Sequence, residues 1–420
     1  MRRLLFVCLD GLGDDPVPEL DDQTPLEAAT TPFLDRLAQQ GRTGSVVTVG
    51  EDIAPESDIA VFAILGYDPH EEHPGRGVVE AVGAGMDFRD GDLAFRVNFA
   101  TADGAQIVDR RVGRDLTSEE AHALADDVDR ELRLPGASFD LRATVEHRGV
   151  LTIRADQGWL SGNVTNTDPA YRKEGHLGVA LETFEPEVLP CEPLDDSPEA
   201  RHAADLTNAF VEGSTKVLEA SHVNERRRRD GKLPANLVLV RDGGDHRPRL
   251  EPIRDRFGPS WGCFVEMPVE RGIAILLGMD PVDAPRLHTE GDYAAWARLA
   301  VEALEGYDAL YVHIKGPDVP AHDGRAEDKR DVISVIDRAF FGELLPGLDL
   351  GRTVIAVTAD HATSCVRMAH TAEPVPLVVS GGPVVSDGSR AYGERACASG
   401  SLRLLRGVDL VGRMVRLLDD

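Results

Sequence analysis

Aspartate and histidine residues follow three apolar runs in this sequence, and side chains of these types bind divalent metal ions. Each run has the aliphatic, partly β-branched composition of a buried strand in a parallel sheet. The runs and the polar residues that follow them are 4–9 with Asp10, 309–314 with Asp318 and His322, and 354–357 with Asp360 and His361. Because open α/β sheets keep their sites at the carboxyl ends of the strands, we expect these side chains to form one cluster that performs metal chemistry.

The spacing of these residues adds to the argument. Asp318 and His322 are four residues apart, which places both on one side of a helix or tight loop, and they suit an ion such as Mn²⁺ or Zn²⁺. Taken alone, this pair is more typical of a polar surface. Asp360 and His361 carry more weight, because adjacent strand residues point to opposite faces and serve one site only where the strand ends. His370 adds a further imidazole nine residues later.

Ser57 lies where a loop enters an apolar helix, within the segment 55–67. This position is typical of a helix N-cap, and it is also where free N–H groups and the helix dipole stabilise an anion. A nucleophilic serine needs a base or a metal to activate it, so a structural cap and a metal-activated nucleophile are both open interpretations. The candidate ligands, enough for two adjacent sites that clamp a phosphoryl group, are Asp10, Ser57, Asp318, His322, Asp360, His361 and His370.

The elements that must position these residues indicate an α/β fold. Helix patterns follow the first strand, and strand and helix patterns alternate again from residue 236 onward. Between these parts, an antiparallel or mixed sheet is indicated by alternating segments at 95–100, 107–111, 141–148 and 150–154. We predict a doubly wound, mostly parallel sheet formed by residues 1–94 and 236–420, with a smaller α+β domain inserted at 95–235.

Arginine residues are concentrated in and beside the predicted insert. Arg110 and Arg111 directly follow Asp109, and paired guanidinium groups hold a phosphate or a carboxylate in a bidentate way. A solvated charged surface is the alternative for any single arginine. The candidate substrate-binding residues are Asp109, Arg110, Arg111, Arg114, Arg148 and Arg241.

The composition of the chain limits its classes of partner. The formal net charge of −28 over 420 residues argues against nucleic acids and anionic membranes, although an arginine-lined pocket can still attract a small anion. No apolar run is long enough to span a bilayer. The five cysteines are scattered and form no CxxC pair, as expected for a reducing cytoplasm. We expect a cytoplasmic enzyme with a small-molecule substrate, and its oligomeric state is open.

The order of the motifs resembles the alkaline phosphatase superfamily, and further segments narrow the resemblance to the archaeal-type cofactor-independent phosphoglycerate mutases. The superfamily motifs are Asp10-Gly11, Pro55-Glu56-Ser57-Asp58, 318–324, Asp360-His361-Ala362-Thr363 and 370–376. The narrower motifs are 65–69, Gly75-Arg76-Gly77, 95–101 and 109–114. The resemblance extends over essentially the whole chain and implies an alkaline phosphatase-like sheet.

This resemblance implies an isomerase that interconverts 2-phosphoglycerate and 3-phosphoglycerate through a phosphoserine, as in glycolysis and gluconeogenesis. It implies two divalent ions, Mn²⁺ foremost, with Co²⁺, Zn²⁺ or Mg²⁺ as alternatives. The implied ligands are Asp318, His322 and His370 for one ion, and Asp10, Ser57, Asp360 and His361 for the other. Ser57 would be the nucleophile.

Departures from the family pattern leave the substrate more open than the reaction class. They lie at Glu56 and Ile59 beside the nucleophile, at Arg271, at Gly316-Pro317 and at Ser364-Cys365. None removes a ligand or the nucleophile. A metal-dependent phosphomonoesterase, a mutase of a related phosphate or phosphonate metabolite, and a catalytically silent binding protein are the alternatives.

Overall fold

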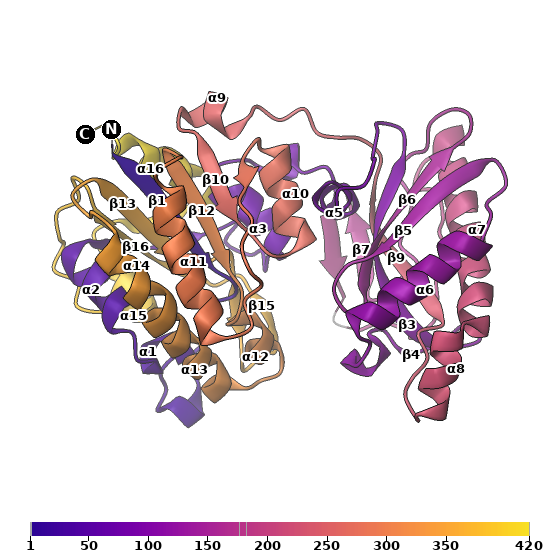
Figure 1. Cartoon of the computed structure of the whole chain (residues 1–420), viewed down its shortest axis with the longest axis horizontal. Coiled ribbons are helices and arrows are strands. Elements are labelled where there is room, and N and C mark those ends of the chain that lie inside the picture. The colour runs from indigo at the N-terminus through magenta and orange to yellow at the C-terminus, as the bar shows by residue number, and fades with distance from the viewer. Residues whose placement is uncertain (1, 176, 182, 420) are drawn as a thin grey trace. The chain divides into compact units, whose positions relative to one another are not determined.

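The computed structural model describes residues 2–175, 177–181 and 183–419, and it divides the chain into two compact units (Figure 1). The first unit consists of Met1–Glu72 and Leu250–Asp420, and the second is the insert His73–Arg249. The insert is wider than the predicted range 95–235, because one helix before that range and one strand after it pack onto the sheet of the insert.

The first unit is built on an eight-stranded sheet with the order β11-β10-β12-β1-β13-β16-β2-β17. Its strands are β1 (Arg3–Leu9), β2 (Arg42–Val47), β10 (Trp261–Phe264), β11 (Asp280–Pro281), β12 (Ala309–Ile314), β13 (Thr353–Thr358), β16 (Val375–Gly381) and β17 (Arg403–Arg406). β16 is antiparallel to both of its neighbours, whereas the other pairings are parallel. The predicted doubly wound, mostly parallel sheet is therefore confirmed.

The centre of this sheet aligns the segments that carry the candidate ligands. β1 lies between β12 and β13, and its Cys8 pairs in register with His313 on one side and with Thr358 on the other. Every residue of these three strands except Arg3 is buried, which explains their continuous apolar composition. Because the three strands are parallel and in register, the residues that follow them emerge at one edge of the sheet.

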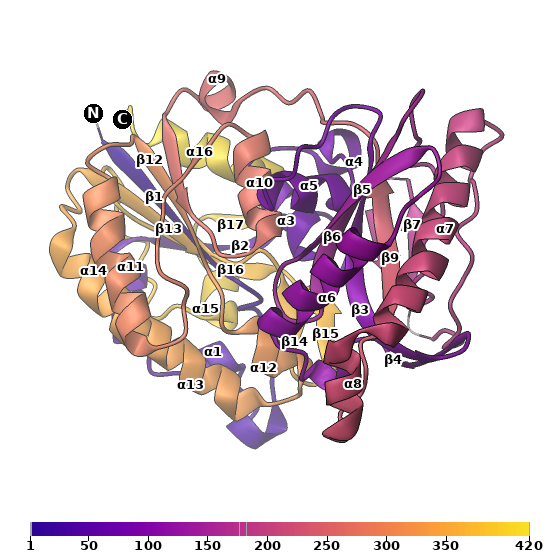
Figure 2. The same cartoon turned by 45° about the vertical axis from the view of Figure 1, so that its right-hand side comes forward.

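Two layers of helices cover this sheet (Figure 2). One layer contains α1 (Pro25–Ala28), α2 (Pro32–Gln40), α11 (Glu290–Ala303), α13 (Ala326–Ile336) and α14 (Gly342–Gly347). The other contains α3 (Ser57–Ile64), α9 (Ile253–Phe257), α10 (Pro268–Leu276) and α16 (Leu410–Arg416). Among the described residues, no helix combines the length and the apolar character needed to cross a membrane.

The insert is built on an antiparallel sheet in which β3 is the central strand. Its strands are β3 (Leu93–Asp103), β4 (Gln106–Asp109), β5 (Ala137–Ala143), β6 (Arg148–Ala155) and β9 (Leu237–Gly244). We expected residues 236–241 in the parallel sheet of the first unit, and that expectation is wrong. The run is β9, which pairs antiparallel with β3. A short buried strand carries no mark of its partner, and the pairing depends on tertiary structure.

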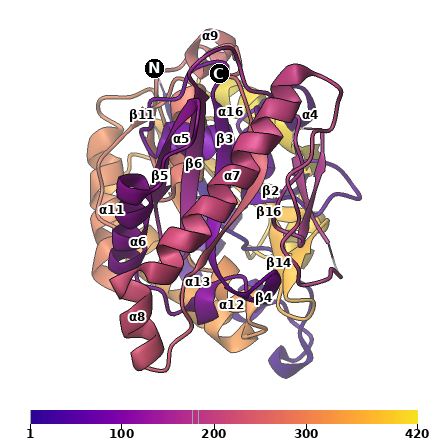
Figure 3. The ribbon, with the colours of Figure 1, turned by 90° about the vertical axis from the view of Figure 1, so that its right-hand side faces the viewer.

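Helices lie on both faces of the sheet of the insert. α6 (Ser118–Glu131) and α7 (Pro198–Ala220) cover one face, where they enclose the main apolar core of the insert (Figure 3). α5 (Arg76–Gly83) packs on the other face through a small cluster that includes Val78 and Met86. α5 and β9 therefore belong to the insert, although both lie outside the range predicted for it.

A buried ion pair holds two of the site-bearing segments of the first unit together. Lys329 of α13 is fully buried, and its ammonium group donates hydrogen bonds to the Asp14 carboxylate (2.8 Å) and to the carbonyl oxygens of Gly13 (2.9 Å) and Thr363 (2.8 Å). Asp14 also accepts a hydrogen bond from the N–H of Cys365 (2.9 Å). The loop after β1 and the segment after His361 are thus fixed to each other.

We expect Lys329→Met to lower the free energy of unfolding by about 3–5 kcal/mol, because it leaves the Asp14 carboxylate buried without its cation. Urea denaturation measures this change. Arg330→Met on the same helix is the matched control, since the ion pairs of Arg330 are with the exposed side chains of Glu327 and Asp331, and it should cost less than about 1 kcal/mol. A Lys329→Met protein as stable as the parent would contradict the expected role of this pair.

Candidate metal and nucleophile site

The ends of β1 and β13 bring the first group of candidate ligands together. Asp10, Asp360 and His361 are all buried, and ligand atoms of the three lie within 4.8 Å of one another. Nε2 of His361 is 3.4 Å from Oδ1 of Asp10 and 3.4 Å from Oδ2 of Asp360. The other carboxylate oxygen of Asp360 accepts a hydrogen bond from the N–H of Gly11 (3.1 Å), which orients the carboxylate.

Ser57 is the first residue of α3, and its hydroxyl faces the same imidazole. Its Oγ lies 3.1 Å from Nε2 of His361. The N-cap of the helix is Glu56, so the expectation that Ser57 occupies the N-cap position is wrong. The hydroxyl of Ser57 therefore contacts the ligand cluster at the amino end of a helix whose dipole favours negative charge on it.

A second group is formed by α12 (Asp318–His322) and β15 (Ala369–Thr371). Oδ1 of Asp318 is 3.4 Å from Nε2 of His322 and 3.5 Å from Nε2 of His370. The Nδ1–H of His370 donates to the carbonyl oxygen of Pro55 (2.8 Å), and this bond leaves Nε2 as the ring nitrogen available to a metal. His322 has the same arrangement, with Nδ1 3.2 Å from the carbonyl oxygen of Met368.

Thr363 links the two groups. Its hydroxyl donates to Oδ1 of Asp318 (2.7 Å) and lies 3.0 Å from Nδ1 of His361. The rings of His361 and His370 stack with 3.8 Å between their centroids. All seven candidate ligands predicted from the sequence therefore lie in one continuous cluster.

The structure adds neighbours that our sequence analysis missed. Lys315, directly after β12, places its Nζ 2.8 Å from Oδ2 of Asp10 and 2.7 Å from Oε1 of Glu270. Nε2 of His313 lies 4.0 Å from Oδ2 of Asp360. Nδ1 of His313 forms a hydrogen bond with the hydroxyl of Tyr311 at 2.8 Å. A lysine at the end of a ligand-bearing strand was a visible signal in a chain poor in lysine. Glu270, in the first turn of α10, gave a weaker one.

The electrostatics of the first group fit a bound cation. Burial would raise the pKa of Asp10, but Lys315 and His361 hold that pKa well below its ordinary value. Burial raises the pKa of Asp360 despite the opposing effect of His361. Oδ1 of Asp10 and Oδ2 of Asp360 are buried, and neither accepts a hydrogen bond from the residues that the structure describes. Such carboxylate oxygens, beside imidazole nitrogens, are ligands that a divalent ion would satisfy.

The predicted substrate-binding residues lie in the insert. Arg110 is bound to an internal partner, since its Nε and one terminal nitrogen donate to Asp168 at 2.8 Å and 2.6 Å. Asp109 accepts a hydrogen bond from the N–H of Arg111 (2.7 Å). Arg241 stacks its guanidinium group 3.5 Å from the ring centroid of Tyr171.

Arginines of the insert produce a strongly positive region. Burial, with Arg148 and Arg111 as the nearest positive neighbours, lowers the pKa of His147 to about 3. Burial and the charge of Arg241 lower the pKa of Arg96, a neighbour that we did not predict as a substrate ligand, to about 9. Burial and Arg114 likewise lower the pKa of Arg111. Mutual repulsion among these groups favours a bound anion.

Comparison with known proteins decides the family. Residues 38–224 match the family model of 2,3-bisphosphoglycerate-independent phosphoglycerate mutase, and residues 276–415 match that of the metalloenzyme superfamily. The mutase of Aeropyrum pernix is 40% identical, with 99% of each chain covered, and that of Methanopyrus kandleri is 38% identical, with 100% of this chain and 97% of the relative covered. The chain belongs to the 2,3-bisphosphoglycerate-independent phosphoglycerate mutase family.

Solved structures agree with this membership in the mutase family. The cofactor-independent phosphoglycerate mutase of Thermoplasma acidophilum is 33% identical, with a TM-score of 0.64 and coverage of 99% of this chain and 100% of that one. A protein of Pyrococcus horikoshii is 32% identical, with a TM-score of 0.81 and coverage of 100% and 97%. The family resemblance inferred from the motifs is therefore confirmed, and the metalloenzyme match supports use of divalent metal.

Metal binding should release a proton from His370. Burial would lower the pKa of this imidazole, but Asp318 and Glu56 raise it to about 9 in the metal-free chain. The ring is therefore protonated at neutral pH, and an ion that needs the neutral ring must displace the proton. We expect Mn²⁺ affinity to increase with pH, by up to about tenfold per pH unit, until the pH exceeds this pKa.

Calorimetric titration at pH 7.5 in buffers of different ionisation enthalpy measures the protons released. The exposed His222, replaced by asparagine, is the control and should leave the release unchanged. His370→Asn should remove the contribution of this imidazole. Mn²⁺ binding with no proton release and no pH dependence would contradict the predicted ligand role of His370.

Proposed function

We propose that this chain interconverts 2-phosphoglycerate and 3-phosphoglycerate, with Ser57 as the nucleophile that carries the phosphoryl group. The observation that carries the proposal is the contact between Oγ of Ser57 and Nε2 of His361, 3.1 Å apart, inside a cluster of carboxylates and imidazoles. Relatives over the full length of the chain are named as mutases of this kind, which supports the same reaction here.

We propose that two divalent ions, Mn²⁺ foremost, occupy the cluster. The ligands of one would be Asp318, His322 and His370, and those of the other Asp10, Ser57, Asp360 and His361. When bound, the ions would lower the pKa of the serine hydroxyl and neutralise charge on the phosphoryl oxygens. The hydroxyl of Thr363 connects the two groups of ligands, since it contacts both Asp318 and His361.

In the proposed reaction Oγ of Ser57 attacks the phosphorus of 3-phosphoglycerate and the bond from phosphorus to the substrate oxygen breaks. The proton lost by Ser57 is returned to the glycerate oxygen, so charge balances. The 2-hydroxyl of the retained glycerate then attacks the phosphorus of the phosphoserine and loses its proton, and the bond from phosphorus to Oγ of Ser57 breaks. Oγ takes up a proton, which restores Ser57 and yields 2-phosphoglycerate. Lys315, 2.8 Å from Asp10, holds positive charge beside the cluster throughout.

We propose that the insert binds the anionic groups of the substrate. The arginines come from residues of the insert, whereas the candidate metal ligands come from the first unit. Guanidinium groups suit both a carboxylate and a phosphate. The predicted set is Asp109, Arg110, Arg111, Arg114, Arg148 and Arg241, with Arg96 added by its position among them. We also propose that the insert excludes water, because water would hydrolyse the phosphoserine.

The buried, unpaired cysteines support a reducing cytoplasm as the compartment.

Product analysis with 3-phosphoglycerate tests the proposed activity. With Mn²⁺ present we expect 2-phosphoglycerate, followed by phosphorus NMR, and no accumulation of inorganic phosphate. Chelation should remove the activity, while circular dichroism shows the fold intact because the α/β core is sufficient without metal. Inorganic phosphate as the main product would make the protein a phosphatase, and full activity in a sample shown to be metal-free would contradict the proposed mechanism.

Ser57→Ala should reduce turnover to the background while leaving the fold unchanged, because no other hydroxyl would carry the phosphoryl group. Mass spectrometry of the acid-quenched parent protein should show phosphate on Ser57 during turnover. The alanine variant should still bind metal through the remaining ligands. Sustained turnover by this variant would exclude the phosphoserine route.

If Arg111 contacts the substrate through a desolvated ion pair, Arg111→Gln should lower kcat/KM. The decrease should correspond to a loss of about 2–5 kcal/mol in transition-state stabilisation. Steady-state kinetics measures this effect. The matched control is Arg201→Gln on α7, where the exposed arginine pairs with Asp196, and its kinetics should be unchanged. If the kinetic constants of Arg111→Gln equal those of the control variant and the parent, Arg111 belongs to the solvated surface and does not contact the substrate.

A further inference from the structure

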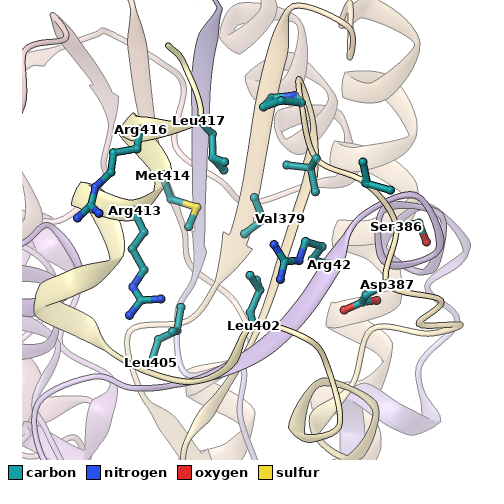
Figure 4. A pocket seen from close by; sticks show the side chains of 13 residues that line it. Arg42, Val379, Ser386, Asp387, Leu402, Leu405, Arg413, Met414, Arg416 and Leu417 are labelled. Carbon is teal, nitrogen blue, oxygen red and sulfur yellow. The ribbon is translucent and has the colours of Figure 1, made fainter. Parts of the chain in front are cut away.

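A pocket lies in the first unit, away from the cluster of candidate metal ligands. Its volume is about 600 Å³, and it is bounded by β2, β16, β17, α16 and the loop after β16 (Figure 4). Arg42, the first residue of β2, pairs in register with Val379, so the pocket lies toward the amino ends of the parallel strands. The candidate ligands Asp10 and Asp360 follow the carboxyl ends of their strands. The two sites are therefore distinct.

The inner wall of the pocket is apolar. Val379 is 1% exposed, Met414 3% and Leu405 4%, and Leu402 and Leu417 complete this wall. These residues come from β16, from β17 with the turn before it, and from the C-terminal helix with the residue after it. The pocket therefore has an aliphatic body suited to an apolar group.

Arginines surround this apolar wall. Figure 4 shows Arg42 and Arg413 approaching the leucines of the pocket from different elements, with Arg416 further along the helix. Nε of Arg42 donates to the hydroxyl of Ser401 (2.8 Å), and Nε of Arg416 donates to the carbonyl oxygen of Gly412 (3.1 Å). Among the described residues, no carboxylate forms an ion pair with any of the three arginines.

Other arginines of the described residues, Arg36 among them, also form no ion pair; Arg42, Arg413 and Arg416 differ in that all three line one apolar pocket. Asp387 lines the same pocket, but its carboxylate accepts hydrogen bonds from the N–H groups of Thr43 (3.0 Å), Ser389 (3.1 Å) and Ser401 (2.9 Å). Burial opposes ionisation of Asp387, yet these bonds hold its pKa well below its ordinary value. Asp387 is therefore an ionised internal anchor of the loop, and among the described residues it forms no ion pair with Arg42, Arg413 or Arg416.

We propose that this pocket binds a small organic anion that has an apolar body and one carboxylate or phosphate group. The volume falls in the range of pockets that enclose small molecules. The aliphatic wall would bury the body, and the guanidinium groups of Arg42 and Arg413 would bind the charged end. Phosphoglycerate has no apolar body, so this ligand class differs from the substrate of the proposed reaction. The inference does not depend on that reaction.

Binding of 2-naphthoate to the full-length, Mn²⁺-loaded protein tests the inference. Ligand-observed NMR titration gives the dissociation constant, with excess 3-phosphoglycerate present to occupy the site of the proposed reaction. The uncharged 2-naphthalenemethanol and the ring-free acetate are probed in the same way. The variants are Arg42→Gln and Arg413→Gln in the pocket. The matched control is Arg36→Gln, since Arg36 of α2 is exposed and pairs with no carboxylate in the described part of the chain.

We expect saturable binding of 2-naphthoate, and a dissociation constant at least about tenfold higher for each pocket variant, for the alcohol and for acetate. Arg36→Gln should bind like the parent. Equal affinity of the alcohol, equal affinity of the pocket variants, or loss of binding when 3-phosphoglycerate is added would overturn the proposal. Sedimentation velocity supplies one further contradictory outcome: a change of oligomeric state in Arg413→Gln would make the pocket a contact between copies of this chain.

Discussion

The ammonium group of Lys315 forms ion pairs with two buried carboxylates, those of Asp10 and Glu270, and a third buried carboxylate, that of Asp360, feels its charge. Much of the first unit serves to hold this charge together. Taking carboxylates out of water is costly unless cations and hydrogen bonds compensate. The structure compensates with Lys315, with His361 and with the N–H of Gly11. Negative charge remains in excess, which is the physical reason that divalent cations suit this position.

The parallel sheet is what makes such a concentration of charge achievable. β1, β12 and β13 are buried over almost their full length, so their apolar side chains supply the stability that the polar ends do not. Hydrogen bonds then hold the segments after these strands together. Lys329 binds both Asp14, in the loop after β1, and the carbonyl oxygen of Thr363, and Asp14 accepts a hydrogen bond from the N–H of Cys365. Preorganised ligands of this kind can bind metal without refolding the chain.

The insert solves the opposite electrostatic problem. Its arginines lie close enough to lower one another's pKa, and a bound anion relieves this repulsion. Tyr171 and Asp168 fix the guanidinium groups of Arg241 and Arg110, which would reduce the entropy lost in the proposed binding of substrate. The insert thus contains a local cluster of arginines within a strongly acidic chain, and the candidate metal ligands lie in the other unit.

The sequence by itself determined the parallel sheet and the strand-end candidates Asp10, Asp360 and His361, because buried strands have continuous apolar composition and these residues follow them. The order of the motifs along the chain indicated the family. Only the tertiary structure decided the partners that come from distant segments. β9 reads as one more parallel strand, but it pairs antiparallel with β3 in the insert, because hydrogen bonding between strands leaves no mark on a short apolar run. Glu270 is likewise an ordinary helix residue in sequence, and its role appears only because α10 places its carboxylate beside Lys315. The sequence also left the role of Ser57 open. The structure shows that α3 begins one residue earlier than an N-cap at Ser57 would require, so that Ser57 is its first residue and its hydroxyl faces His361.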